Sequence, residues 1–340
     1  MLLLTTPATG IAADPDNAST LAGRAAPSIV HITGRLHERD EQPYVEASGF
    51  FVDPDGRVLS VASAFTHAPT RLMCERFEVR LFDGRRLTAR AQAADALLNL
   101  LLLSLDDTDG GHPVLEVASR GARPDEPVVA VAASRTPNEV AFAAGEVKAQ
   151  HKTSVYGIGL GDMYIDLYLD PSPGGDGGPL LDGAGKVIGI MTPNIHRPAD
   201  QPESPGESHA LPMRTARGFI KISEQRTLSE TTWIGLAFRP LTPDEAKAAS
   251  ALLGRRAGVF VDFVWPAGPA GATDIRAGDI IVAVDGKDMP DLFRLEQRLD
   301  AAAIGDRVDL AVLRDGRIVF RQLSVDQRPR WAGFVPWRVE

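Results

Sequence analysis

The hydrophobic positions of this chain fall into short runs rather than long helical stripes. Between about residue 26 and residue 192 the runs are rich in Val, Ile, Leu and Phe, and Asp-Gly pairs separate several of them, at Asp55-Gly56, Asp83-Gly84 and Asp182-Gly183. Glycine supplies the positive φ that hairpin turns require. The pattern therefore predicts short antiparallel strands that form β-barrels or β-sandwiches.

A different pattern begins near residue 233 and continues to about residue 325. Strand-type runs alternate there with two helical stretches, Thr242 to Leu253 and Asp291 to Ala302. The leucines of the second stretch fall on one face of a helix, which predicts a compact α+β module. Residues 215–223 resemble a short helix, residues 224–232 a polar linker, and the Pro-, Ser- and acid-rich residues 193–208 a surface loop.

Composition narrows the possible functions. Lys and Arg number 36 against 45 Asp and Glu, a net charge of −9 without any basic block, which argues against nucleic-acid binding. A single cysteine, Cys74, excludes an internal disulfide, and the seven histidines show no paired ligand spacing, so we expect no metal site and no cofactor. The longest apolar stretches are far shorter than the ~20 residues of a transmembrane helix.

The first 13 residues contain a short Leu run and end on small residues before Asp14, like the end of a secretory signal that lacks its basic start. We therefore predict an exported protein with a truncated signal peptide, in which residues 1–25 are a signal-like segment and N-terminal extension. A frayed N-terminus is the alternative interpretation.

The segment from Ala47 to Ser60, ASGFFVDPDGRVLS, resembles the strand-turn-strand that opens HtrA (DegP-like) trypsin-fold serine proteases. Further segments resemble that family in the same order, at residues 79–87, 95–106, 128–145, 173–189 and 209–212. The resemblance implies an all-β double β-barrel of the trypsin-like (chymotrypsin) fold over residues 26–223. After the linker it implies an α+β PDZ domain over residues 233–325 and a C-terminal tail over residues 326–340.

The same resemblance locates the catalytic triad, and all three of its positions are changed. The histidine position falls on Ser63, the aspartate position on Asn99 and the nucleophile position on Asp176. Ser63 cannot act as a general base near neutral pH, and Asn99 carries no charge to stabilise an imidazolium. Asp176 places a carboxylate where an oxyanion should develop. Loss of the nucleophile or the base alone costs roughly 10⁶-fold in kcat in a related protease.

A rebuilt mechanism has few candidates. An aspartic-type dyad needs two carboxyl groups, and only Asp176 lies at the inferred site. A shifted register would bring His67 close, but a nucleophile would still be missing. Cys74 is expected to be a small buried residue, and Ser172, four residues before the nucleophile position, an ordinary loop serine.

Several binding features remain, as the resemblance implies. The oxyanion loop comprises Gly174, Gly175 and Asp176, and the strand that begins at His209, Ala210 and Leu211 would pair with an extended substrate. In the PDZ domain the residues expected to bind a peptide C-terminus are Trp233, Ile234, Gly235 and Leu236. Leu292 and Leu295 are candidates for the border of the groove, although core packing is the commoner role for such leucines.

The sequence thus predicts a proteolytically inactive, periplasmic HtrA-like protein. It would bind unfolded proteins or peptide C-termini in envelope protein quality control or regulation. The alternative is a serine-type endopeptidase with a displaced, non-standard triad, and a third hypothesis is structural support of a partner complex. Family members form trimers through an aromatic N-terminal segment, but residues 14–43 contain no aromatic residue except histidine, so a homo-oligomer stays open.

Overall fold

The computed structural model divides the chain into two compact units, one formed mainly by residues up to 225 and the other mainly by residues 226–335. Each unit is described by itself. The structure describes residues 15–35, 45–67, 72–74, 76–95, 98–106, 109–155, 158–169, 175–193, 206–224, 232–255 and 258–327.

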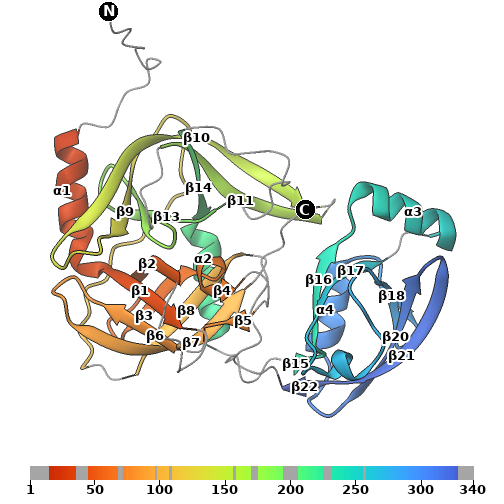
Figure 1. Ribbon diagram of the computed structural model, residues 1–340. Coiled ribbons are helices and arrows are strands. Elements are labelled where there is room, and N and C mark those ends of the chain that lie inside the picture. Colours follow the sequence, from red (N-terminus) through yellow and green to blue (C-terminus); the bar gives the residue numbers. More distant parts are fainter. Residues whose placement is uncertain are drawn as a thin grey trace, which may run out of the picture. The chain divides into compact units, whose positions relative to one another are not determined.

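The first unit begins with a closed, six-stranded antiparallel barrel (Figure 1). Its strands, in the order in which they are hydrogen-bonded, are β1 (Ile29–Arg35), β2 (Val45–Phe51), β3 (Arg57–Val61), β8 (Leu100–Leu105), β7 (Arg86–Asp95) and β6 (Arg76–Arg80). The predicted turn at Asp55-Gly56 joins β2 to β3, and Gly56 has the expected positive φ of 97°. A two-stranded ribbon, β4 (Thr66–His67) with β5 (Leu72–Met73), follows β3.

A second closed barrel follows in the same unit, again of six strands (Figure 1). It consists of β10 (Val140–Val155), β11 (Ile158–Tyr168), β14 (Glu207–Pro212), β13 (Val187–Met191), β12 (Pro179–Asp182) and β9 (Pro127–Ala133). Two six-stranded barrels in succession confirm the predicted double-barrel fold. Residues 194–205 of the expected surface loop lie outside the described residues, whereas Glu207 and Ser208 belong to β14.

Two helices pack on this unit. Helix α2 (Met213–Ser223) follows β14, close to the predicted position. Helix α1 (Pro15–Ala25) was not predicted, since these residues were assigned to an N-terminal extension. Its buried residues Ala18, Leu21, Ala22 and Ala25 follow the i, i+3, i+4, i+7 spacing of an amphipathic helix and join the core of the unit. Residues 15–25 are therefore part of the folded barrel unit.

The second unit is an α+β module, as predicted. Its main sheet has the order β16 (Leu236–Pro240), β17 (Val259–Val264), β18 (Ile280–Val284), β20 (Arg307–Arg314) and β21 (Arg317–Ser324), and β19 (Lys287–Asp288) pairs with β18. A separate ribbon joins β15 (Thr232–Trp233) to β22 (Asp326–Gln327). The helices are α3 (Pro243–Leu253) and α4 (Leu292–Asp300), both within the predicted stretches.

The start of α3 follows from local sequence. Thr242 accepts a hydrogen bond from Glu245 N at 3.2 Å, and the Glu245 carboxylate accepts one from Thr242 N at 2.8 Å. This reciprocal pair is a capping box, which satisfies amide groups that a helix N-terminus leaves without partners. Among the described residues, every helix is too short or too polar to cross a lipid bilayer.

Candidate functional site

Ser63 lies at the end of β3, in the short 3₁₀ turn η2 (Ser63–Phe65), and is half-buried. Its main-chain N–H donates a hydrogen bond to Asn99 Oδ1 at 2.8 Å. Its hydroxyl oxygen accepts a hydrogen bond from Asn99 Nδ2 at 3.0 Å. The structure therefore brings two of the three predicted triad positions into direct contact.

Asn99 is almost fully buried, with 1% of its surface exposed, and its φ of 55° lies in the left-handed region that asparagine tolerates well. Its Nδ2 also donates to Thr192 Oγ1 at 3.0 Å, so both amide donors and the amide oxygen are used. Because the oxygen faces a main-chain N–H, only one orientation of the amide fits. We call these three residues the Ser63–Asn99–Thr192 cluster.

The chemistry of this cluster is neutral. Two alcohols and an amide neither take up nor release a proton near neutral pH, so none of the three side chains can serve as a general base. Thr192, which follows β13, was not singled out from the sequence. It lies 93 residues from Asn99 along the chain, and only the pairing of the two barrels brings them together.

Asp176, the third predicted position, lies with an exposed side chain in the turn before β12. Gly178 N donates to Gly175 O at 3.0 Å across this turn, and Ser48 N donates to Asp176 O at 3.0 Å. The turn is thus attached through its main chain to β2 of the first barrel. Gly174 of the predicted oxyanion loop lies outside the described residues.

The two glycines after Asp176 fit a tight space between the barrels. A Cβ atom on Gly177 would lie 2.1 Å from Ser48 O, and one on Gly178 would lie 2.1 Å from Val131 O. Gly177 also has a φ of 85°. Only glycine fits both the backbone conformation and the available space at Gly177.

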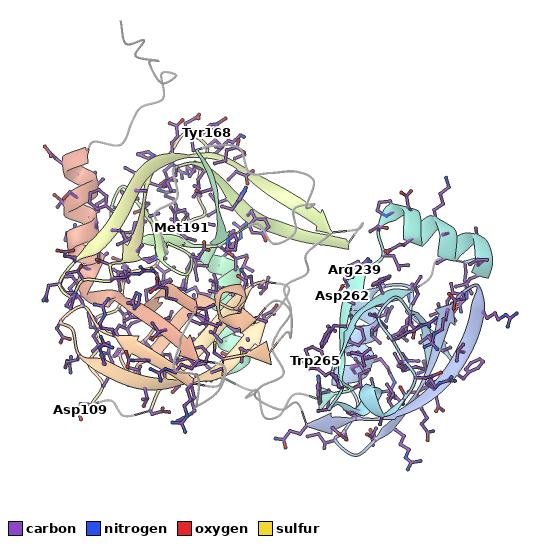
Figure 2. The ribbon with its side chains drawn as sticks, viewed as in Figure 1. Asp109, Tyr168, Met191, Arg239, Asp262 and Trp265 are labelled. Carbon is purple, nitrogen blue, oxygen red and sulfur yellow. The ribbon has the colours of Figure 1, made fainter. Side chains whose placement is uncertain are left out.

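Hydrogen bonds connect this turn to the cluster. Gly177 N donates to Met191 O at 2.8 Å, and Met191 N donates to Gly178 O at 2.8 Å. Met191, labelled in Figure 2, immediately precedes Thr192. The structure therefore gathers Ser63, Asn99 and Asp176 around one junction of the two barrels.

Three further residues were considered as a nucleophile or a base: Cys74, His67 and Ser172. Cys74 is 2% exposed, and burial raises the pKa of its thiol to about 12, which is unfavourable for a thiolate nucleophile. His67 lies in β4, but its side chain lies outside the described residues, as does all of Ser172. In the part of the chain that the structure describes, no group of three His, Cys, Asp or Glu residues could hold a metal ion.

The predicted substrate strand is occupied on both sides. Ala210 pairs with Ile165 of β11 and with Met191 of β13, and Leu211 pairs with Ile190 of β13. His209, Ala210 and Leu211 are also buried, with 7%, 0% and 0% exposure. Because β14 is paired on both sides in the closed barrel, these residues offer no free strand edge. The prediction that an extended substrate pairs along them is corrected for this reason.

Sequence reasoning missed a part-buried pair beside this strand. His209 Nδ1 lies 2.9 Å from Asp166 Oδ1, and the His209 ring meets the ring of Tyr164 edge-on with centroids 5.9 Å apart. Asp166 and His209 are register partners on adjacent strands, so their side chains share one face of the barrel. No spacing in the sequence indicates this pair, because 43 residues separate its members.

Main-chain hydrogen bonds hold the predicted carboxylate-binding loop of the second unit in place. Ala270 N donates to Ile234 O and Trp265 N donates to Gly235 O, each at 3.0 Å. Gly235 has a φ of 76°, and a Cβ atom there would lie 3.0 Å from the main chain of Gly268 and Pro269. The loop therefore requires glycine at this position and leads directly into β16.

Aromatic packing holds the same loop. The rings of Trp233 and Trp265 meet edge-on with centroids 5.8 Å apart, and Trp265 meets Phe263 similarly at 5.2 Å; Trp265 is labelled in Figure 2. Trp233, Ile234 and Leu236 are all buried. The loop is therefore a rigid element, and its main chain is the part best suited to meet a ligand.

Strand β16 is an edge strand of the sheet, and it carries one well-fixed charge. The Arg239 guanidinium lies 3.6 Å from the centre of the Phe260 ring and donates to both Glu245 oxygens at 2.7 Å. Burial raises the pKa of Glu245, but hydrogen bonds from Arg239 and the Thr242 amide outweigh it, so the pKa lies below its ordinary value. Figure 2 labels Arg239 and the nearby Asp262.

The two leucines proposed to border the groove are interior residues. Leu292 is 3% exposed and Leu295 is 0% exposed. Their side chains therefore fix α4 from within the unit and present almost no surface to a ligand.

Comparison with known proteins gives two domain assignments. Residues 47–190 match the trypsin-like peptidase domain family, and residues 232–325 match the PDZ domain family. The chain is similar to a probable periplasmic serine endoprotease DegP-like of Brucella suis, with 29% identity over 298 residues, 86% of this chain and 55% of that protein. It is also similar to the serine protease Do-like HtrA of Bacillus subtilis, with 26% identity over 267 residues, 74% of this chain and 57% of that protein.

The chain thus spans a little over half the length of these curated relatives. Among solved structures it resembles the HtrA-type protease AlgW with decapeptide, with 23% identity and a TM-score of 0.52 over 92% of this chain and 99% of that one. It also resembles the serine endoprotease from Yersinia pestis, with 20% identity and a TM-score of 0.50 over 93% and 100% of the chains. The chain therefore contains a trypsin-like domain of two six-stranded barrels followed by a PDZ domain, and it resembles HtrA/DegP-like serine proteases.

Proposed function

We propose that this protein is a proteolytically inactive HtrA-like protein that binds unfolded proteins or peptide C-termini. The observation that carries the proposal is the Ser63–Asn99–Thr192 cluster. At the positions that the resemblance assigns to the imidazole and the orienting carboxylate of a protease, this chain has neutral side chains that hydrogen-bond to one another.

Each substitution removes one requirement of serine proteolysis. A hydroxyl at Ser63 cannot take a proton from a nucleophile, and an amide at Asn99 cannot stabilise an imidazolium. A carboxylate at Asp176 opposes the negative charge that develops on the substrate carbonyl oxygen. With all three replaced, serine proteolysis by the usual mechanism is not expected.

The PDZ domain supports a binding role. Its β16 is an edge strand that follows directly on the Trp233–Leu236 loop, and a peptide can add to such an edge through main-chain hydrogen bonds. The loop, in which Gly235 permits the close approach of Gly268 and Pro269, would receive the terminal carboxylate. A related structure, AlgW, is named with a bound decapeptide.

The location and partners of the protein are part of the same proposal. The Brucella suis relative is named as periplasmic, and the signal-like first residues agree with export. We therefore place the protein in the periplasm, in envelope protein quality control or regulation.

A second candidate function is serine-type endopeptidase activity with a displaced triad. One observation favours it, the part-buried pair of His209 and Asp166, because a histidine held by a carboxylate is the arrangement that activates a serine. The relatives are also named as serine proteases.

Peptide release from β-casein, an unfolded substrate, followed by mass spectrometry, separates the two candidates. Wild type, Ser63→Ala, Asp176→Ala and His209→Ala are run side by side after each is shown to be folded. We expect no cleavage by any of them. Cleavage by wild type that is lost in His209→Ala would refute inactivity and establish the displaced triad.

Binding is tested on the same preparations by fluorescence anisotropy. A labelled peptide with a free C-terminal carboxylate is compared with its C-terminal amide, which changes the ligand and leaves the protein intact. We expect the amide to bind at least about tenfold more weakly, since a charge-assisted hydrogen bond is lost. Equal affinity for the two peptides would contradict the carboxylate-binding role of the loop.

A further inference from the structure

A cavity of about 350 Å³ lies in the first unit, where β13 begins and β14 gives way to α2. It has no part in the chemistry considered above. Val187 and Thr192 are five residues apart along an extended segment, so the cavity wall and the cluster are roughly 15 Å apart.

One wall of the cavity is apolar and fixed. Val187, Ile188 and Met213 contribute to it, and each is at most 3% exposed. The segment that faces them is attached to β13, since Ala118 N donates to Val187 O at 3.0 Å and Val187 N donates to Glu116 O at 2.8 Å. The cavity therefore lies between two segments held together by main-chain hydrogen bonds.

Three arginines also line the cavity. Arg120, Arg214 and Arg217 line the cavity, and no acidic residue is among the described residues that do so. Arg214 and Arg217 are exposed and stand three residues apart on α2, a spacing that puts two side chains on one side of a helix. In a chain with a net charge of −9, this positive charge is local.

The three arginines differ in their availability. Arg120 is held by ion pairs with Glu126 and, at 3.6 Å, with Asp182. Arg217 makes no hydrogen bond or ion pair with any residue that the structure describes. Its guanidinium is thus the group in the lining best placed to bind an incoming anion.

We propose that this cavity binds a small amphiphilic anion, a carboxylate or phosphate group attached to a short apolar chain. Arg214 makes an interaction of its own within the chain, so the guanidinium of Arg217 would be the main group that holds the oxyanion. A guanidinium presents paired donors that match two oxygens. The apolar chain would lie against Val187, Ile188 and Met213.

The size of the cavity agrees with such a ligand. Ligand pockets span roughly 300 to 1,000 Å³ and are mostly apolar, with a few polar groups that fix orientation. At about 350 Å³ this cavity is at the small end of that range. A ligand of a few carbon atoms and one charged group is therefore expected, rather than a nucleotide or a folded partner.

Isothermal titration calorimetry on the full chain tests the proposal with four probes: hexanoate, hexyl phosphate, hexanol and inorganic phosphate. The variants are Arg217→Gln and the double variant Arg214→Gln/Arg217→Gln. Arg317→Gln is the matched control, since Arg317 is also exposed and its side chain makes no hydrogen bond or ion pair with the described residues. Each variant changes surface residues, so folding should be preserved.

We expect hexanoate and hexyl phosphate to bind wild type and Arg317→Gln alike. The double variant should bind them at least about tenfold more weakly, which corresponds to about 1.4 kcal/mol. Hexanol or inorganic phosphate binding as tightly as hexyl phosphate would overturn the proposal, as would equal affinity in the double variant. A Kd above about 1 mM for both amphiphilic probes would also overturn it.

Discussion

Replacement of Asn99 by alanine tests whether the Ser63–Asn99–Thr192 cluster stabilises the barrel unit. Asn99 is 1% exposed and makes three side-chain hydrogen bonds, with the Ser63 amide, the Ser63 hydroxyl and the Thr192 hydroxyl. Alanine removes all three and leaves the partners in a nearly closed space. It must also adopt the φ of 55° that asparagine tolerates.

The magnitude follows from these contacts. Three hydrogen bonds at about 1 kcal/mol each give about 3 kcal/mol, and the left-handed backbone adds about 1 kcal/mol for alanine. Asn99→Ala should therefore lower the free energy of unfolding by about 4 kcal/mol. That is a large share of the 5 to 15 kcal/mol typical of a domain.

Asn138→Ala is the matched control. Asn138 has a φ of 61°, but it is exposed and its side chain makes no hydrogen bond with the described residues. Asn138→Ala should lower the free energy of unfolding only by the backbone contribution, about 1 kcal/mol. In a unit of this size the remaining difference of about 3 kcal/mol corresponds to a Tm difference of roughly 6 to 12 °C.

The assay is differential scanning calorimetry, with tryptophan fluorescence as an independent signal. Trp233 and Trp265 belong to the second unit, whereas Trp331 and Trp337 lie outside the described residues. Fluorescence is therefore recorded on a Trp331→Phe/Trp337→Phe background, in which it reports on the second unit. Asn99→Ala should lower the calorimetric transition of the barrels and leave the fluorescence transition unchanged. Equal destabilisation by Asn99→Ala and Asn138→Ala would refute the reasoning, because the cluster would then contribute nothing.

Three further changes have expected outcomes. Gly177→Ala should destabilise the barrels by about 3 kcal/mol through strain and overpacking, whereas Gly183→Ala, with nothing within 4 Å of its Cβ position, should change stability by less than about 0.5 kcal/mol in urea denaturation. Glu245→Gln should cost about 1 kcal/mol at pH 7. Because Arg239 and the helix cap lower the pKa of Glu245 below 4.5, its contribution is complete above pH 4.5 and is lost as the pH falls further, so denaturation curves of variant and wild type should converge there. Cys74 should resist iodoacetamide in the folded chain and react on unfolding, as mass spectrometry would show; rapid labelling of folded protein would contradict its burial.

The parts of the fold that local sequence determines were predictable. Neighbouring residues determine the short β-type runs, the turns at Asp55-Gly56 and Asp83-Gly84, and the start of α3 through the capping box of Thr242 and Glu245. In the turn at Asp182-Gly183 the positive φ occurs at Gly185 instead of Gly183. The pattern of α1 was also present, in the apolar spacing of Ala18, Leu21, Ala22 and Ala25. This spacing was not interpreted as a helix, because the preceding residues resemble a signal peptide and residues 1–25 were assigned together to that segment and its extension.

Contacts between distant strands were not predictable in the same way. The bond from Asn99 to Thr192 and the pair of Asp166 with His209 depend on the register of strands that lie far apart in sequence. The occupied edges of β14 have the same origin, because a sequence does not show on which side a strand will be paired. The resemblance to a family predicted the triad positions, and only the structure shows that Ser63 and Asn99 are in contact.

The turn that carries Asp176 keeps its geometry through its main chain and its glycines. The turn is held by main-chain hydrogen bonds to Ser48 and Met191 and by the close fit of Gly177, while the side chain at position 176 is exposed. None of these interactions depends on which side chain occupies that position. The stability of the paired barrels therefore constrains the glycines and the main chain of this turn. Selection for a stable fold alone would preserve this geometry whether or not the chain cleaves peptides.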